Sequence, residues 1–457
     1  MMRTLSGAVA NVPLRRDGAQ PSALAQGLDT AAFWMLCGMM VFAPLAFGAV
    51  EPWAVFLLQS GMAVIALLLV AHGVMNPNGW SGLRNAALLP AVLFIALVGA
   101  QLGFGLSLYR HATYVEFLRV VAYGIGFAAA LQLLRGSDRL RQFIMFIAIF
   151  GFAISLFALV QHFTAPDKLY WLRTPSQGGH IFGPFVNRNH YAGLMEMITP
   201  FAVVGFLVPY TRKEKRILML FAATLASASL VLSLSRAGVV SLVVEMAFLA
   251  CFLSFRAGNK RAAYGVAALS LPLVALVAWL GTARLIERFS ILEDWMRMAI
   301  SRDALRMFGE HWTIGTGLGT FPTVYPQYRS FATDLFVNQA HNDVLQLMVE
   351  TGLPGLVLVV WFLVVVYRQG LVKAQGWVTS WKGAASLAAL TGITGLLVHS
   401  LADFNLRIPS NALFFCILCG LAAAREREKA LLIEQSHRFR RTTAVGVIEE
   451  GVDEERE

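Results

Sequence analysis

Charged residues are scarce in this chain of 457 residues, because Asp, Glu, Lys and Arg together make up only 14% of it. A typical soluble domain contains about 25%. Hydrophobic residues reach 57%, so the composition disfavours disorder, a nucleic-acid-binding module and a small disulfide-rich scaffold, and it predicts a membrane protein. We therefore interpret the formal net charge of +10 loop by loop, as evidence of membrane topology or of phosphate binding, and expect no nucleic-acid partner.

Cysteine is also rare. The four cysteines, Cys37, Cys251, Cys416 and Cys419, all lie within apolar stretches. A structural disulfide or a zinc site is therefore disfavoured, and Cys416 and Cys419 are interpreted as small residues that pack between helices.

Long apolar stretches are abundant, and about 20 such residues suffice to cross the hydrocarbon core of a bilayer. We predict an all-α polytopic membrane protein with about twelve spans, at residues 29–49, 53–72, 86–106, 113–134, 140–163, 190–210, 215–234, 237–255, 262–282, 343–367, 382–401 and 407–424. The chain is thereby divided into an N-terminal segment (1–28), nine spans (29–282), a long loop (283–342), three spans (343–424) and a charged tail (425–457). No cleaved signal peptide is expected.

Lys and Arg collect in alternate loops, and basic loops remain in the cytoplasm. The loops with more basic residues contain Arg84, Arg135, Arg139, Arg141, Arg212, Lys213, Lys215, Arg216, Arg256, Lys260, Arg261, Arg368, Lys373 and Lys382. An even number of spans then puts both termini in the cytoplasm and the long loop outside. A loop of about 60 residues among short connections is usually functional. The apolar spacing in its first half predicts one or two amphipathic helices over the membrane surface.

Two short polar motifs lie at the external ends of expected membrane spans. Asn187, Arg188 and Asn189 precede one span, and Arg236 lies in a tight turn between two others. Asn and Arg at a helix start also cap the helix and extend toward the interface, so a structural role stays open for both motifs. The guanidinium of Arg236 suits a phosphate, because it is planar, permanently charged and able to bond two oxygens.

The long loop carries further arginines and a glycine triplet. Arg288, Arg297, Arg302, Arg306 and Arg329 lie in it, and some of them are ordinary surface charges. Arg302 and Arg306 are four residues apart and share one helix face. The following segment 315–321 resembles a dinucleotide-binding fingerprint, but it follows no strand, so we interpret it as a flexible turn.

A histidine stands where the long loop returns to the membrane. His341 and Asn342 precede an expected span, and the imidazole can act as a general base because a histidine titrates near neutral pH. A purely structural histidine is the alternative. Glu350 would lie on the opposite helix face, so we expect it to pair within the bundle. The last external turn adds polar groups for scaffolding or sugar contacts: His399, Asp403, Asn405 and Asn411.

At these residues the chain resembles the O-antigen ligase and polymerase superfamily. The resemblance covers roughly residues 30–425 and rests on 185–189, on 235–238, on Arg302 before the glycine-rich stretch, and on His341-Asn342 with Glu350-x-Gly352-x-x-Gly355. It implies a GT-C type membrane glycosyltransferase of the bacterial inner membrane that takes a glycan from undecaprenyl pyrophosphate. In the ligase branch the acceptor is the lipid A-core sugar, on the periplasmic face. His190 and Trp312 depart from the family's usual residues without separating the branches.

The resemblance implies that Arg236 and Arg302 bind pyrophosphate and that His341 is catalytic. Arg188, Arg288 and Arg306 are further candidates for phosphate contact, and Asn187, Asn189, Asn342 and His399 for sugar contact or support. Because the external loops contain no Asp-x-Asp, we expect no metal and no cofactor, and a single displacement predicts inversion at the anomeric carbon. Two alternatives stay open: a polymerase using the same donor, and, from another class, a lipid or solute transporter. A protein O-oligosaccharyltransferase is disfavoured by the short C-terminal tail.

Overall fold

The computed structural model describes residues 22–76, 79–175, 180–268, 291–334 and 336–425, and its regular elements over these ranges are helices. The prediction of an all-α membrane protein is confirmed. Several expectations fall outside the described residues: Arg288, the first 21 residues, most of the expected span 262–282, and the tail beyond Arg425.

Nine helices in the described ranges are long and apolar enough to cross a membrane. They are α1 (Ala23–Leu45), α2 (Pro52–Met75), α4 (Arg110–Leu133), α5 (Ser137–Thr164), α6 (Arg188–Leu207), α7 (Lys213–Leu232), α8 (Arg236–Cys251, continued by a π-helical turn to Arg256), α12 (Asp343–Ala374) and α13 (Trp381–His399). Two shorter apolar helices, α3 (Leu88–Gly103) and α14 (Pro409–Ala423), bring the total to eleven. Each overlaps one stretch expected from the sequence, and the twelfth is the stretch that lies mostly outside the described residues.

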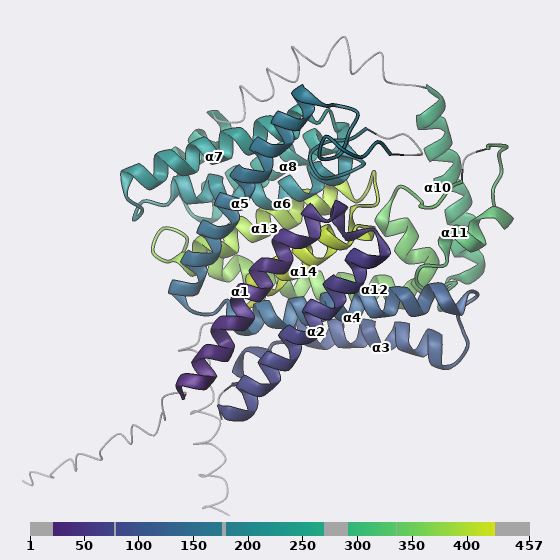
Figure 1. Cartoon of the computed structure of the whole chain (residues 1–457), viewed down its shortest axis with the longest axis horizontal. Coiled ribbons are helices and arrows are strands. Elements are labelled where there is room, and N and C mark those ends of the chain that lie inside the picture. Colours follow the sequence, from purple (N-terminus) through teal and green to yellow (C-terminus); the bar gives the residue numbers. More distant parts are fainter. Residues whose placement is uncertain (1–21, 77–78, 176–179, 269–290, 335, 426–457) are drawn as a thin grey trace, which may run out of the picture.

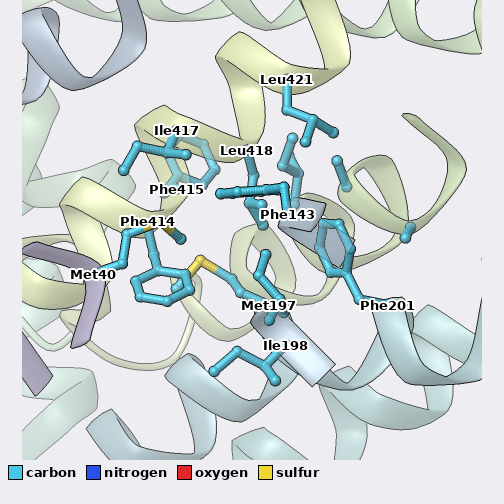
Figure 2. Packing of buried hydrophobic residues seen from close by; sticks show 14 of the residues in the cluster. Met40, Phe143, Met197, Ile198, Phe201, Phe414, Phe415, Ile417, Leu418 and Leu421 are labelled. Atoms are coloured by element: carbon cyan, nitrogen blue, oxygen red, sulfur yellow. The ribbon is translucent and has the colours of Figure 1, made fainter. Parts of the chain in front are cut away.

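Helices α6, α13 and α14 occupy the middle of the bundle, as Figure 1 shows, and most of their residues are buried. Their side chains meet those of α1 and α5 in a large apolar core, part of which Figure 2 shows around Met40, Phe143, Phe201 and Phe414. Phe143 and Phe201 pack edge to face with ring centroids 6.5 Å apart. The central helices therefore form a fixed scaffold from which the connecting turns project.

Small residues allow the central helices to approach closely. A Cβ built on Gly392 of α13 would lie 2.9 Å from the Cα of Met197 in α6, and one on Gly395 would lie within 1.7 Å of a Glu245 carboxylate oxygen in α8. Such contacts are typical of helix packing in membranes, where small residues let backbones touch. They hold α6, α8 and α13 together next to the turn that follows α13.

The described part of the long loop folds into helix α10 (Ile291–His311), the short helix α11 (Phe321–Val324) and a 3₁₀ turn at Tyr325–Gln327. They lie at one side of the bundle (Figure 1). Ile300, Ala304 and Met307 of α10 share a small apolar cluster with Phe321 and with Val349 of α12. The loop is thereby attached to the first turns of α12.

The glycine-rich segment between α10 and α11 is a fixed connection, not the flexible turn expected. The amide of Gly317 donates to the carbonyl of Glu350 at 3.0 Å, and the side-chain amide of Gln101 donates to the same carbonyl at 2.8 Å. Gly352 breaks the regular path of α12 with φ 65°. Because Gly315 also has positive φ and a Cβ there would lie 2.3 Å from the Glu350 backbone, the two backbones can meet only where glycine stands.

Candidate active site

His341 is held in an unusual backbone conformation immediately before α12. Its φ is +51°, a left-handed value that residues other than glycine adopt rarely and at a cost of about 1–3 kcal/mol. The next residue, Asn342, fixes the position by accepting the amide of Leu345 at 3.0 Å and donating to the carbonyl of Leu401 at 2.9 Å. The imidazole therefore lies just before the first turn of α12, and the next residue is hydrogen-bonded both to α12 and to the turn that follows α13.

Asp403 is the carboxylate that faces this histidine. Its Oδ1 lies 3.4 Å from Nδ1 of His341, and the Asp403 side chain is 1% exposed, whereas that of His341 is 30% exposed. Asn189, at the start of α6, donates to Oδ2 of the same carboxylate at 2.5 Å. Burial raises the pKa of Asp403, but the contact with His341 and the nearby imidazoles His190 and His399 outweigh it, and the net effect lowers this pKa.

An aromatic ring separates the two histidines of the site. Phe404 packs edge to face against His190 of α6, with ring centroids 4.8 Å apart, and against His341, at 5.0 Å. The turn 400–408 thus supplies both a carboxylate and a hydrophobic wall. Asp403 and Phe404 cover part of the His341 ring, and the rest of this side chain is exposed.

A second carboxylate, Asp343, fixes this turn. Ser400 donates its hydroxyl to Oδ2 of Asp343 at 2.8 Å, and the amide of Leu406 donates to the same oxygen at 2.9 Å. The amide of Asp343 in turn donates to the carbonyl of Ser400 at 2.8 Å. These bonds join the start of α12 to the end of α13, so the spacing between His341 and Asp403 is set by the fold.

Arg188 and Arg236 lie at the starts of α6 and α8. Arg188 directly precedes Asn189, the residue that contacts Asp403. Arg236 is half-buried, and Gly238 beside it packs against α6, since a Cβ there would lie 2.6 Å from the Cβ of Ala192. These two of the five candidate phosphate-binding arginines therefore belong to neighbouring helix starts on the side of the bundle that carries Asn189.

The arginines of α10 are arranged differently. Arg302 and Arg306 are exposed, and Arg306 donates to the carbonyl of Tyr328 at 2.9 Å. Arg297 donates to the carbonyl of Ala402 at 3.2 Å, next to Asp403. Among the described arginines of α10, it is therefore Arg297 that contacts the turn of the site.

Arg407 belongs to the structural framework. It pairs with Glu350, as expected for a carboxylate that pairs within the bundle. Burial lowers the pKa of Arg407, but Glu350 and Glu116 more than compensate and raise it. Glu350 also accepts the amide of Phe321 at 3.2 Å, so this pair ties α11 and α12 to the turn 400–408.

Three ionisable groups are fully buried below the turn. His399, the last residue of α13, contacts Glu196 of α6 through Nδ1 at 2.7 Å, and Glu245 of α8 lies nearby. Neither carboxylate oxygen of Glu245 has a hydrogen-bond partner among the described residues, and the same holds for Nε2 of His399. Ionisable groups inside a membrane bundle are costly and usually functional.

The described residues contain no group of three or more His, Cys, Asp or Glu side chains placed to hold a metal ion.

The comparison with known proteins finds a family match over part of the chain. Residues 219–360 match the family model described as O-antigen ligase. Over this segment, which is less than half of the chain, the protein is similar to the O-antigen ligase family. No curated protein matches it. The match runs from α7 into α12, so it includes Arg236, Arg302 and His341.

The match supports an enzyme of the O-antigen ligase and polymerase type, and the apolar helices of the described residues support a multi-pass membrane protein. Asn187, Asn189, His399 and Asp403 lie outside the matched residues. The structure nevertheless places Asp403 against His341 and Asn189 against Asp403, so the candidate site extends beyond the matched segment.

Sequence reasoning did not find the partner of His341. Asp403 was grouped with residues for scaffolding or sugar contact, and Arg297 was named only among the loop arginines. A signal for Asp403 exists in the sequence, because an acid that directly follows an apolar helix on the side of a candidate base is a plausible partner. For Arg297 no sequence signal distinguishes it from its neighbours.

Proposed function

We propose that the protein is an O-antigen ligase, which transfers a glycan from undecaprenyl pyrophosphate to the lipid A-core oligosaccharide on the periplasmic face of the inner membrane. The observation that carries this proposal is the pairing of a half-buried histidine with a buried, ionised carboxylate at the mouth of the bundle. A carboxylate beside Nδ1 orients the ring and stabilises its protonated form, which is what a general base needs.

The reaction requires one displacement. The acceptor hydroxyl attacks the anomeric carbon, its proton passes to His341, and the bond from that carbon to the pyrophosphate oxygen breaks with its electron pair leaving on the pyrophosphate. The anomeric configuration is inverted. In this scheme Nε2 of His341 takes the proton while Nδ1 faces Asp403. General base catalysis of this kind contributes about 10²- to 10⁴-fold in rate.

The departing pyrophosphate needs positive charge. We assign this role first to Arg236 and Arg188, because both begin helices at the side of the bundle that carries Asn189. Helix N-termini add a partial positive charge of their own. Arg302 is assigned to the same role from the resemblance, with Arg306 and Arg288 as further candidates. Arg302 is exposed on α10 and is therefore available to a substrate.

The remaining candidates are best suited to support. Asn187 caps α6 by accepting the amide of Asn189 at 2.9 Å, and Asn342 caps α12. His399 is buried against Glu196. We assign Asn187, Asn342 and His399 to holding the site in shape, and Asn189 to orienting Asp403, with sugar contact left to groups that face the substrate.

An apolar cavity beside the site suits a lipid chain. It has a volume of about 350 Å³ and is lined by α3, α4, α12 and α14. Asp343, Ser400 and Arg407 line its polar part and also belong to the framework of the site. We assign this cavity to the polyprenyl tail of the donor, so that a carrier lipid enters between helices while its headgroup reaches His341.

A lipopolysaccharide gel tests the proposal in a strain that lacks the protein, complemented with wild type or with His341→Ala. For a ligase, the core band persists without attached repeats, polymerised glycan accumulates on its carrier, and only wild type restores the ladder. If core bearing a single repeat remains and the ladder alone disappears, the protein is a polymerase. Transport of labelled lipid by the purified protein without glycosyl transfer would support a transporter instead.

A further inference from the structure

A second cavity lies far from His341, between α1, α5 and α7. It has a volume of about 560 Å³, and its walls are mostly apolar, with Trp34 and Val41 from α1 and Phe146, Phe150 and Ala153 from α5 among them. The rings of Phe146 and Phe150 are nearly parallel, with centroids 6.3 Å apart, and form a flat side of the groove. Within the described residues, this groove is lined by α1, α5 and the first turn of α7.

Two cations stand at one end of this groove. Arg141 is in the second turn of α5 and Lys215 in the first turn of α7, and both line the cavity. Both are exposed and form no hydrogen bond or ion pair with any of the described residues. Cations near the start of a helix oppose the helix dipole, so helix stability does not account for their position.

Neighbouring arginines have partners, which distinguishes them from these two cations. Arg139, two residues from Arg141, bonds Asp29 at 3.2 Å and Thr30 at 2.8 Å. Arg216, next to Lys215, donates to the carbonyl of Phe206 at 2.8 Å. Among the described residues, Arg141 and Lys215 are the cations that line the groove itself.

The surrounding segments are strongly basic. Residues 135–141 and 212–216 contain Arg135, Arg139, Arg141, Arg212, Lys213, Lys215 and Arg216 against two acids, Asp138 and Glu214. This excess favours an anion at the groove. The groove also belongs to the opposite end of α5 from the connection to α6, and α5 with its 28 residues is about 42 Å long. A ligand there is therefore separate from the site of His341.

The length of the groove matches one leaflet of a bilayer. Arg141 and Ala153 both line it and are twelve positions apart on α5, which corresponds to about 18 Å along the helix. Half of a hydrocarbon core measures about 15 Å. A headgroup at Arg141 would therefore leave room for one acyl chain along the wall of the groove.

We propose that this groove binds an anionic glycerophospholipid, with one acyl chain between α1 and α5 and the phosphate between Arg141 and Lys215. Basic pockets between membrane helices recognise anionic headgroups in this way. A zwitterionic lipid carries its own ammonium group beside the phosphate, so it gains less from the two cations. The proposal does not depend on the glycosyltransferase activity.

Tryptophan fluorescence tests the proposal directly, because Trp34 lines the groove. The full chain is reconstituted into phosphatidylcholine nanodiscs that contain increasing fractions of phosphatidylglycerol brominated on its acyl chains. The chain has ten tryptophans, so the signal of Trp34 is taken as the difference between wild type and Trp34→Phe. We expect brominated phosphatidylglycerol to quench this signal at a lipid fraction about 5- to 30-fold lower than the fraction of brominated phosphatidylcholine that gives the same quenching.

Three variants separate the parts of the proposal. Arg141→Ala/Lys215→Ala should remove the preference for the anionic lipid, whereas the control pair Arg212→Ala/Lys213→Ala, on the same basic end but outside the groove lining, should retain most of it. Ala153→Phe should narrow the groove and weaken quenching while both cations remain. Equal quenching by the two lipids in wild type, or loss of the preference in the control pair alone, would overturn the proposal.

Discussion

Oδ1 of Asp403 lies 3.4 Å from Nδ1 of His341, although α12 and α13 separate the two residues in the sequence. His341 precedes α12 and Asp403 follows α13. The contact depends on the hydrogen bonds between Asp343 and Ser400 that join the start of α12 to the end of α13. The proposed base and the carboxylate beside it are thereby positioned by the central helices of the bundle, and the predictions below follow from that arrangement.

Removing the carboxylate of Asp403 should impair turnover more than substrate binding. In Asp403→Asn the ring of His341 loses its anionic partner, so we expect kcat to fall by on the order of 10²-fold with KM little changed. The lowered pKa also has a thermodynamic consequence. The carboxylate contributes stability above its unfolded pKa near 3.9, and this contribution is lost as pH falls toward the lower folded pKa.

Melting temperatures in detergent test the predicted pH dependence of the stability that Asp403 contributes. Wild type should exceed Asp403→Asn by its full margin at about pH 5, and the margin should shrink below about pH 4. A margin that stays constant down to the lowest accessible pH, or that grows on acidification, would contradict the assignment.

Arg236 should act on the donor. If its guanidinium bonds the pyrophosphate, Arg236→Ala removes charge-assisted hydrogen bonds of about 1.5–3 kcal/mol, which corresponds to a roughly 10- to 100-fold weaker donor affinity. Arg236→Lys should restore only part of this, because a lysine cannot form the bidentate contact. Donor binding by each variant is measured with labelled carrier lipid, and Arg368→Ala, at the other end of α12, serves as the control. Unchanged donor affinity in Arg236→Ala would remove this arginine from the site.

Glu245 offers a test of the buried cluster. Both of its carboxyl oxygens lack partners among the described residues, and a buried polar group without a partner destabilises the fold. Glu245→Gln replaces it with a neutral group of similar shape, so we expect an equal or higher melting temperature. Glu196→Gln, which removes the partner of His399, should lower it by a few degrees. The opposite order of the two variants would show that Glu245 holds a partner that the fold requires.

Gly315 should tolerate no side chain. It has φ of +80°, and a Cβ there would lie 2.3 Å from the Glu350 backbone, so Gly315→Ala should destabilise the protein by more than about 2 kcal/mol. Gly309 of α10 is the matched control, because nothing lies within 4 Å of a Cβ at that position. Gly309→Ala should stabilise the helix by about 0.5–1 kcal/mol. Thermal unfolding of both variants compares them, and similar melting temperatures would contradict the proposed close packing of the two backbones.

The helices could be predicted from the sequence because each needs only a local stretch of apolar residues. The sequence also indicates His341 and Arg236 as candidates, since a polar residue at the end of a span is conspicuous in an apolar chain, and their roles stay predictions. The partner of His341 could not be predicted, because Asp403 reaches it only through the packing of α12 against α13 and α14. The kink at Gly352 and the anchoring of the segment 315–319 depend on the same long-range contacts, so the glycines suggested mobility where the structure has a close backbone contact.

The central claim is that His341 is the general base of glycosyl transfer. Purified wild type and His341→Ala should be compared with a lipid-linked glycan donor and a lipid A-core acceptor, with His311→Ala on α10 as the control. The account predicts that His341→Ala lowers transfer by about 10²- to 10⁴-fold while donor binding and melting temperature stay near those of wild type. Transfer at the wild-type rate by His341→Ala would contradict it.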